Sequence, residues 1–413
     1  MIRAIVTQHI EDAEIMAEQR VHFVRRPNVT LRHLARFDSR LAANIEGIGL
    51  AGKTGRELLR ARIDDDGPAA LLPLGVLDLE SGDSRRIDEF IALATKDIRM
   101  AQVASTALGW VGSARAACVR VEKRGGGKGL AATVALSAWR LHGIDPGSAL
   151  IEAIRQDDPQ VRSAAYETAG AIGRRDLLSF CGIATADANP DTRFWAAWAA
   201  VLLGERSRAL RVMTHVSHDS AHYSPSFQLS IQAMSQDDTH AELERLAHDR
   251  TRLRWLIRGC GIAGNPRYGS WLINQMAAND TARVAGEALT VMTGVDLTHP
   301  DLEREAPESF SSGADDDPDC HDVAMDEDDG LPWPDPDKVH RWWEANQSRF
   351  TPGQRYFMGA PVTREHCIEV LKNGYQRQRI LAAHYLCLLE PGTPLFNTSA
   401  PAWRQQRMLA EMK

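Results

Sequence analysis

The chain has 413 residues and a formal net charge of −7, and its composition is 44% hydrophobic and 6% aromatic, which is ordinary for a protein with a packed core. This length allows roughly two or three compact domains or one extended repeat array. Residues 313–337 contain eleven acidic residues and no Lys or Arg, so the rest of the chain has 44 acidic and 48 basic residues. That near-neutral remainder argues against a chain dedicated to nucleic acid or to an anionic membrane.

The cysteines and the first residues indicate the compartment. No two of the six cysteines form a C-x-x-C pair, so the sequence suggests neither a zinc ribbon nor a dense disulfide framework. Glu11, Asp12 and Glu14 interrupt the apolar run that a signal peptide needs, and no stretch of eighteen apolar residues occurs. We therefore expect a cytoplasmic chain without a membrane segment.

Residues 1–64 show helical spacing of apolar residues. One such stretch covers residues 5–24 and a second covers residues 31–48, with Thr30 in place to accept hydrogen bonds as an N-cap. Because these residues precede the repeat described below, we predict an N-terminal helical cap over the first repeat.

Residues 47–54, GIGLAGKT, match the P-loop pattern G-x-x-x-x-G-K-[ST]. In a P-loop, Lys53 would reach the phosphates of a nucleotide and Thr54 would hold Mg²⁺. Residues 71–80, LLPLGVLDLE, resemble the acidic strand that accompanies a P-loop, with Asp78 near its end. However, a P-loop follows a buried strand, and the residues before position 47 have helical spacing. We interpret residues 47–54 as a turn between helices and 71–80 as the first helix of a repeat; a P-loop nucleotide binder is the less favoured alternative.

A repeat of about thirty residues runs through residues 65–296. Four stretches begin with Asp or Asn, continue as Ala-rich helical sequence and end at Gly, namely 97–112, 158–173, 189–204 and 279–294. The stops recur every 29 to 31 residues, at Gly82, Gly112, Gly143, Gly173, Gly204, Ser235, Gly264 and Gly294. An N-cap at the start and a left-handed Gly at the end predict one helix per unit, and a second helix follows each stop.

Two further positions recur within the repeat. Small residues stand eight positions before four of the stops and would let neighbouring helices pack closely: Ala104, Ala135, Ala165 and Ala196. Arginines stand eleven positions before three of the stops, at Arg162, Arg193 and Arg283, and Arg254 stands ten positions before a fourth. The arginines could bind phosphate, but we interpret them as an inter-repeat ladder with capping Asp residues.

This pattern resembles the short HEAT-like repeats of the phycobilisome-lyase type. The resemblance implies an all-α, HEAT-like α-solenoid with an N-terminal helical cap and a C-terminal helical module. We accordingly divide the chain into a cap (1–64), HEAT-like repeats (65–296), an acidic linker (297–338) and a C-terminal helical module (339–413).

Two segments and one histidine group contain residues that could bind a cation or a partner. The acidic linker lacks the spacing of a calcium loop, so we expect a solvated segment that is disordered or loosely draped. The glycine-rich residues 124–129 are interpreted as a flexible loop between repeats. His215, His218 and His222 could hold a metal if helical, but an inter-helix turn with exposed histidines is favoured. We therefore predict no metal and no cofactor.

The C-terminal module supplies the candidate partner-binding residues. They are aromatic residues and arginines, which are typical interface anchors: Trp333, Trp342, Trp343, Arg355, Arg377, Arg379 and Trp403. The tryptophans could equally pack the module onto the last repeat, and the arginines could pair with the acidic linker or with a partner.

Four segments of the tail carry a second resemblance: HRWWEANQSRF, PGQRYFMGAPV, NGYQRQR and PGTPLFNTSAPAWRQQ. They are similar to an uncharacterised proteobacterial family of HEAT-like repeat proteins whose genes often lie near those of type VI secretion spike proteins. The resemblance implies no catalytic residues. We predict a non-catalytic scaffold or adaptor that binds protein, assisting assembly of a type VI secretion spike or effector. The alternative is a nucleic-acid-binding HEAT-like protein of the DNA glycosylase kind.

Overall fold

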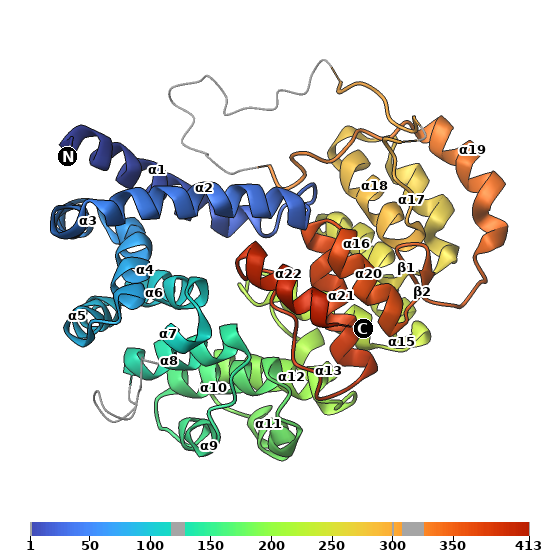
Figure 1. Ribbon diagram of the computed structural model, residues 1–413. Coiled ribbons are helices and arrows are strands. Elements are labelled where there is room, and N and C mark those ends of the chain that lie inside the picture. Colours follow the sequence, from blue (N-terminus) through green and yellow to red (C-terminus); the bar gives the residue numbers. More distant parts are fainter. Residues whose placement is uncertain (1, 117–128, 300, 308–325, 413) are drawn as a thin grey trace. The chain divides into compact units, whose positions relative to one another are not determined.

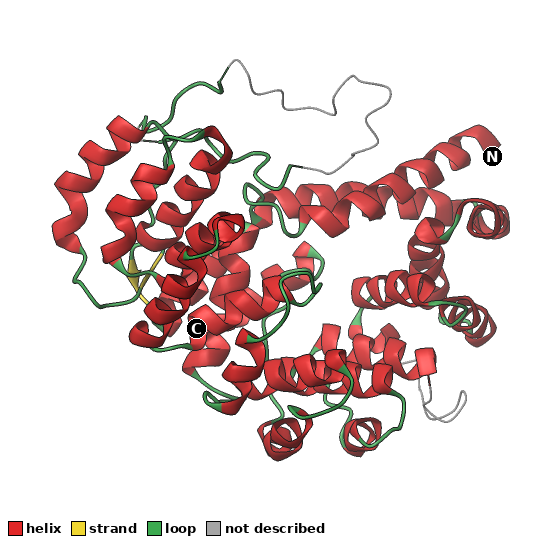
Figure 2. Cartoon of the chain, turned by 180° about the vertical axis from the view of Figure 1, so that it is seen from behind, coloured by secondary structure: helices red, strands yellow, loops and turns green. Residues whose placement is uncertain are grey.

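The computed structural model describes residues 2–116, 129–299, 301–307 and 326–412, and nearly all of their regular structure is helical (Figure 1). The only strands in these ranges are β1 (Tyr356–Phe357) and β2 (Ala360–Pro361), which pair as an antiparallel hairpin and are yellow in Figure 2. The predicted all-α class is therefore confirmed.

The chain divides into two compact units. Unit 1 consists of residues 1–25, 29–216 and 386–413, and unit 2 consists of residues 26–28 and 217–385. The boundary at residue 216 lies inside the predicted repeat segment 65–296, and the predicted C-terminal module 339–413 contributes to both units.

Unit 1 begins with three helices that pack in sequence, α1 (Arg3–Phe23), α2 (Leu31–Leu50) and α3 (Gly52–Asp66). The helices expected over residues 5–24 and 31–48 are thus present. The Thr30 hydroxyl accepts a hydrogen bond from the His33 backbone N–H, as predicted for an N-cap. Leu34 and Leu41 of α2 are fully buried, so α2 turns its apolar stripe inward.

Alternate helices of unit 1 form a continuous series in which each packs on the next. These first helices of the repeats are α4 (Leu71–Ser81), α6 (Ile98–Trp110), α8 (Gly129–His142), α10 (Pro159–Ala171) and α12 (Pro190–Leu202). The second helices are α5 (Ser84–Ala94), α7 (Ser113–Ala116), α9 (Ser148–Ile154), α11 (Leu178–Ala184) and α13 (Arg208–Thr214). The C-terminal α22 (Ala402–Glu411) also belongs to unit 1 and packs on α2.

Unit 2 continues the same alternation. Its first helices are α14 (Tyr223–Ala233), α16 (Leu253–Ala263) and α18 (Asn279–Thr293), and its second helices are α15 (Gln236–Ala247) and α17 (Gly269–Gln275). They are followed by α19 (Pro336–Asn346), α20 (Arg364–Asn373) and α21 (Gln376–Leu389), whose residues after Tyr385 are assigned to unit 1. Short 3₁₀ turns occur at Pro68–Ala70, Arg175–Leu177, Arg250–Arg252, Pro266–Tyr268 and Gln347–Arg349.

The predicted caps and stops largely define the helix ends. Asp97, Asp158 and Asn189 each accept a backbone hydrogen bond at the start of α6, α10 and α12. The prediction was wrong for Asn279, which lies inside α18, because Ala278 is the N-cap there and makes no side-chain bond. Positive φ angles confirm the left-handed stop at Gly82, Gly143, Gly173, Gly204, Gly264 and Gly294, but Gly112 and Ser235 do not adopt it.

Small residues do allow close helix packing. The side chains at the four recurrent alanine positions are at most 1% exposed: Ala104, Ala135, Ala165 and Ala196. Glycines make the approach closer still, since a Cβ on Gly170 of α10 would lie 2.7 Å from the Cα of Ala199 in α12. In unit 2, a Cβ on Gly261 of α16 would lie 2.7 Å from the Cα of Ala288 in α18.

The hairpin of unit 2 closes on the ends of the repeat helices. The Tyr356 backbone N–H donates to the Gly264 carbonyl at the end of α16 (2.8 Å), and the Met358 N–H donates to the Val291 carbonyl in α18 (2.7 Å). The sequence predicted only helices in residues 339–413, so the hairpin is a correction. Its short strands are stabilised by these distant helix ends rather than by a local apolar pattern.

Part of the acidic linker is also packed. Residues 308–325 lie outside the described residues, as do residues 124–128 of the glycine-rich loop. On either side of that gap, Leu302 and Trp333 are buried, and the Asp335 backbone N–H donates to the Leu302 carbonyl at 2.8 Å. The expectation of a disordered or loosely draped segment was therefore wrong for residues 301–307 and 326–338, because paired backbone and buried apolar groups hold them.

Candidate protein-binding surface

The recurrent arginines of unit 1, Arg162 and Arg193, both contact Asp187 in the segment before α12. Arg162 of α10 pairs with Asp187, which precedes the next first helix, at 3.2 Å, and Arg193 of α12 donates to the Asp187 backbone carbonyl at 2.8 Å. Asp187 in turn accepts a bond from the backbone N–H of the capping residue Asn189. The ladder interpretation is confirmed for Arg162, whereas the bond of Arg193 lies within its own repeat.

The matching arginines of unit 2, Arg254 and Arg283, bind the acidic linker, and Arg254 also donates to the Asp280 backbone carbonyl at the start of α18 (2.8 Å). Each of four arginines pairs with one of four consecutive acids: Arg283 with Asp326 (2.7 Å), Arg258 with Glu327 (2.6 Å), Arg254 with Asp328 (2.7 Å) and Arg26 with Asp329 (2.8 Å). We call residues 326–329 the acidic turn, and Arg26, Arg254, Arg258 and Arg283 the arginine face. Guanidinium groups suit this role because their planar N–H donors match the geometry of carboxylates.

The acidic turn forms through its own side chains and a glycine. The Asp326 carboxylate accepts a hydrogen bond from the Asp328 backbone N–H at 3.0 Å, and the Asp326 carbonyl accepts one from the Asp329 N–H at 3.1 Å. Gly330 follows with a φ of +82°, a conformation that L-residues with a Cβ rarely adopt. Asp and Gly at these positions favour a turn, so residues 326–330 fold back locally and present their carboxylates to the arginines.

Burial differs sharply among the four acids. The Asp328 side chain is only 4% exposed, whereas those of Asp326, Glu327 and Asp329 are 41%, 66% and 52% exposed. The bond from Arg258 lowers the pKa of Glu327 below its usual value. Burial raises the pKa of Asp326, but the Asp328 backbone N–H and Arg283 together outweigh this, so the net pKa is lowered. These two acids are therefore held in their charged form.

A buried tryptophan anchors the chain just after the acidic turn. The Arg283 guanidinium lies 4.9 Å from the centre of the Trp333 ring, a distance that allows a cation–π interaction. The Trp333 carbonyl accepts a bond from the Arg304 backbone N–H at 2.8 Å, and Glu303 forms an antiparallel bridge with Pro334. The two sides of the linker are thus joined next to the arginine face.

The structure places two of the seven candidate residues at the acidic turn. Trp333 stacks with Arg283, and Arg377 of α21 donates both to Glu287 (2.7 Å) and to the Glu327 backbone carbonyl. The sequence had left open whether Arg377 pairs with the acidic linker or with a partner, and the structure contains the first of these contacts.

The other candidates of unit 2 pack within that unit. Trp343 is 3% exposed and lies against Gly269, while Trp342 is half-buried. Arg355 donates to the carbonyls of α14 and its end, with the Ile231 oxygen at 2.7 Å, and Arg379 is fully buried and donates to the Leu371 carbonyl. These contacts stabilise the packing of unit 2 rather than the acidic turn.

In unit 1, Trp403 of α22 is 39% exposed and meets Trp110 edge to face, with 4.8 Å between ring centres.

The sequence reasoning missed Arg26 and Arg258 as well as the role of the acidic turn. A signal was available for Arg258, because it stands four residues after Arg254 on the same helix face. Nothing in the sequence distinguishes Arg26 from other exposed arginines.

The structure around residues 47–54 differs from that of a P-loop. Residues 47–50 end α2 and residues 52–54 begin α3, so no strand precedes the motif and only Ala51 lies between the helices; the expected turn is limited to that residue. The Lys53 side chain is 90% exposed and its ammonium lies 3.6 Å from the Glu57 carboxylate. Asp78, in α4, is buried and pairs with Arg56 at 2.7 Å. Residues 71–80 are the first helix of a repeat, as interpreted from the sequence.

The histidine group also makes ordinary contacts. The His215 ring bonds to the Arg211 carbonyl at 2.7 Å, and the His218 ring packs on Tyr223 and Trp255. Within the described ranges, no group of three or more His, Cys, Asp and Glu side chains is placed to hold a metal ion.

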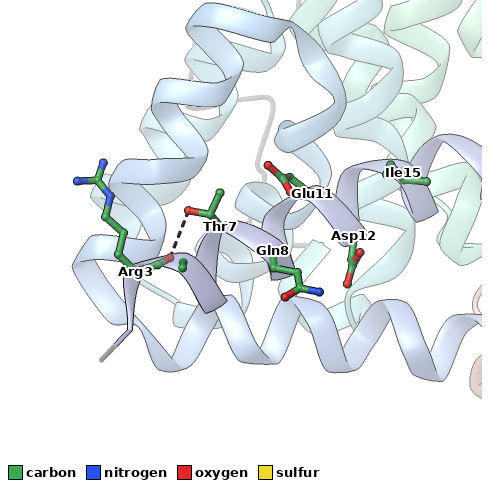
Figure 3. Close-up of a pocket in the computed structure, with 7 residues that line it drawn as sticks. Arg3, Thr7, Gln8, Glu11, Asp12 and Ile15 are labelled. Atoms are coloured by element: carbon green, nitrogen blue, oxygen red, sulfur yellow. Dashed lines mark hydrogen bonds between the residues drawn. The ribbon is translucent and has the colours of Figure 1, made fainter.

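A shallow hollow lies along α1 (Figure 3). Its lining comes from one helix only, namely Arg3, Ala4, Thr7, Gln8, Glu11, Asp12 and Ile15. The hydrogen bond drawn there joins the Thr7 hydroxyl to the Arg3 carbonyl, which is a contact within the helix. Groups that converge from several elements are typical of a ligand site, and this hollow does not have them.

Comparison with known proteins identifies the repeats. Residues 147–224 match a family model described as HEAT repeats. These HEAT repeats cover α9 through α13, and together with the helix pairs they establish the all-α, HEAT-like solenoid. HEAT repeats are commonly scaffolds for protein–protein interaction, since stacked helix pairs present an extended surface. No curated protein and no solved structure matches the chain. None of the helices in the part that the structure describes has the length and apolar character needed to cross a bilayer.

Proposed function

We propose that this chain is a non-catalytic scaffold that holds another protein on its HEAT repeats. The observation that carries the proposal is the arginine face of unit 2, which already holds the acidic turn through four side-chain ion pairs, three of them from repeat helices. Helical repeats bind peptides and domains in this manner, and the described residues at this surface include no nucleophile with an adjacent base.

A narrower proposal concerns the partner. The tail segments from HRWWEANQSRF to PGTPLFNTSAPAWRQQ resemble the family encoded near type VI secretion spike genes. We therefore propose a spike or effector of such a system as the protein that the scaffold helps to assemble, in the cytoplasm. Support for this step is the resemblance alone.

The arginine face does not favour the nucleic-acid alternative. Affinity for nucleic acid requires cationic groups that can neutralise phosphates. Here each arginine is matched by its own carboxylate in the acidic turn, and Arg377 is matched by Glu287. The surface thus has little net positive charge as it stands.

A pulldown tests the proposal. The full chain with an affinity tag is expressed in its native cells, and co-purifying proteins are identified by mass spectrometry against a tag-only control. We expect a stoichiometric protein partner, with spike or effector components among the enriched proteins. Enrichment of a partner without any secretion component would remove the narrower proposal, and the absence of any specific partner would overturn the scaffold itself.

A further inference from the structure

The arginine face spans two neighbouring repeats of unit 2. Arg254 and Arg258 are one turn apart on α16, and Arg283 lies on α18, which packs directly on α16. Side chains four residues apart share one face of a helix. The two helices therefore present three guanidinium groups to the same strip of surface, which is the arrangement by which repeat proteins bind an extended ligand.

The acidic turn meets this surface as a ligand would. Its backbone hydrogen bonds are largely internal, within residues 326–331, and four of its contacts to the arginine face are made by side-chain carboxylates. Arg377 makes the contact to its backbone, at Glu327. Recognition therefore depends on closely spaced negative charges more than on the identity of the segment that carries them.

The attachment is suited to exchange. Three of the four carboxylates remain between 41% and 66% exposed, and ion pairs that water can reach are individually weak and screened by salt. Only Asp328 is buried in the contact. Another acidic segment that presents the same charges could replace the exposed carboxylates while the buried Trp333 keeps the linker attached to unit 2.

We propose that the arginine face is a binding site for an acidic peptide segment of a partner protein, and that the chain's own acidic turn occupies the site as an intramolecular competitor. The inference rests on the proposed scaffold function and adds the chemistry of the partner and its regulation. A tethered competitor acts at an effective concentration on the order of millimolar. A partner thus binds only if its acidic segment matches the arginines better or if the acidic turn is first displaced.

The test compares peptide binding before and after the competitor is disarmed. The probe is a fluorescein-labelled synthetic peptide of sequence DEDDGLPWP, which copies residues 326–334, and binding to the full chain is followed by anisotropy. In the disarmed variant, Asp326→Asn, Glu327→Gln and Asp329→Asn remove three exposed charges and keep the buried Asp328. We expect this variant to bind the probe at least about tenfold more tightly than the natural chain does, because the tethered competitor is weakened.

Two controls make the result specific. A charge-matched variant with Glu11→Gln, Asp12→Asn and Glu18→Gln changes three exposed acids of α1, and it should bind the probe no better than the natural chain. Adding Arg254→Gln and Arg258→Gln to the disarmed variant should abolish the gain. The neutral peptide NQNNGLPWP should not bind, and circular dichroism confirms that each variant is folded.

Three outcomes would overturn the proposal. One is equal affinity of the natural and disarmed chains for the probe. Another is binding that survives the loss of both arginines. The third is preference of the disarmed chain for a labelled oligonucleotide over the acidic peptide, which would assign the face to nucleic acid. Because the probe is synthetic, these outcomes are independent of whether the pulldown finds a natural partner.

Discussion

A buried ion pair in unit 1 links the N-terminal helices to the C-terminal helix, and its contribution to stability can be measured directly. The Arg20 guanidinium of α1 binds the Asp38 carboxylate of α2 through two hydrogen bonds, at 2.7 and 3.2 Å. The Arg20 and Asp38 side chains are 7% and 0% exposed. Asp38 also accepts a bond from the Ala402 backbone N–H at the start of α22, at 2.8 Å. The pair therefore joins three helices.

We predict that Asp38→Asn lowers the free energy of unfolding by about 3–5 kcal/mol, because it leaves the buried Arg20 charge without a counter-ion. Arg20 lies 5.2 Å from the centre of the Trp110 ring, and this cation–π contact offsets part of the loss. The matched control is Asp329→Asn, which breaks an ion pair whose side chains are 31% and 52% exposed. That change should cost less than about 1 kcal/mol.

Urea unfolding followed by tryptophan fluorescence and circular dichroism measures both costs. Because unit 1 and unit 2 can unfold in separate transitions, the two signals should be compared before a single free energy is assigned. The double variant Arg20→Met/Asp38→Leu should recover much of the loss, since apolar replacement of a buried pair is often neutral. Equal costs for Asp38→Asn and Asp329→Asn would refute this reasoning, because burial would then make no difference.

Three further predictions concern the acidic turn, the helix stops and the P-loop motif. The stability that Asp326 and Glu327 contribute should be complete above their ordinary pKa values of 3.8 and 4.5 and be lost as pH falls through the lowered folded values. In urea titrations, the difference in unfolding free energy between the natural chain and Asp326→Asn/Glu327→Gln should therefore disappear in acid. A difference that persists in acid would contradict this prediction. Gly264→Ala should destabilise more than Gly143→Ala in thermal melts, since both have positive φ but only the first would place a Cβ against the Tyr356 carbonyl; the left-handed conformation alone costs about 1–2 kcal/mol. Lys53→Ala should change stability by less than about 0.5 kcal/mol, and ATP should not raise the melting temperature of either form.

The repeats could be predicted from the sequence because their causes are local. A capping Asp or Asn, an Ala-rich stretch and a Gly in the left-handed conformation act within about fifteen residues of one another, and each recurs with the period of the fold. Asp97, Asp158 and Asn189 cap as expected. The exception, Asn279, has an alternative N-cap one residue earlier, and local pattern does not decide between neighbouring positions.

The acidic turn could not be predicted because its partners are distant in the sequence. Composition alone favours disorder for a stretch with so many acids, and that expectation ignores arginines that lie 43 to 74 positions away or, for Arg26, 303 positions away. Arg254 and Arg283 come close to one another only through the packing of α16 on α18. The same limit applies to Trp343 and Arg379, whose burial follows from tertiary packing rather than from any local signal.

In both units, C-terminal residues donate hydrogen bonds to backbone carbonyls at the ends of repeat helices. A helix leaves its last carbonyls without partners inside the helix, and a stack of parallel first helices collects such carbonyls along one edge. In unit 2, Arg355 and the Tyr356 N–H bond to the ends of α14 and α16. In unit 1, the Leu395 N–H donates to the Ala171 carbonyl at the end of α10 at 2.8 Å, and Arg404 donates to the Trp110 and Val111 carbonyls at the end of α6. Cationic donors are favoured at these negative helix ends. A tail that supplies donors to successive repeats is therefore part of each unit's structure, in keeping with the division of residues 339–413 between the two units.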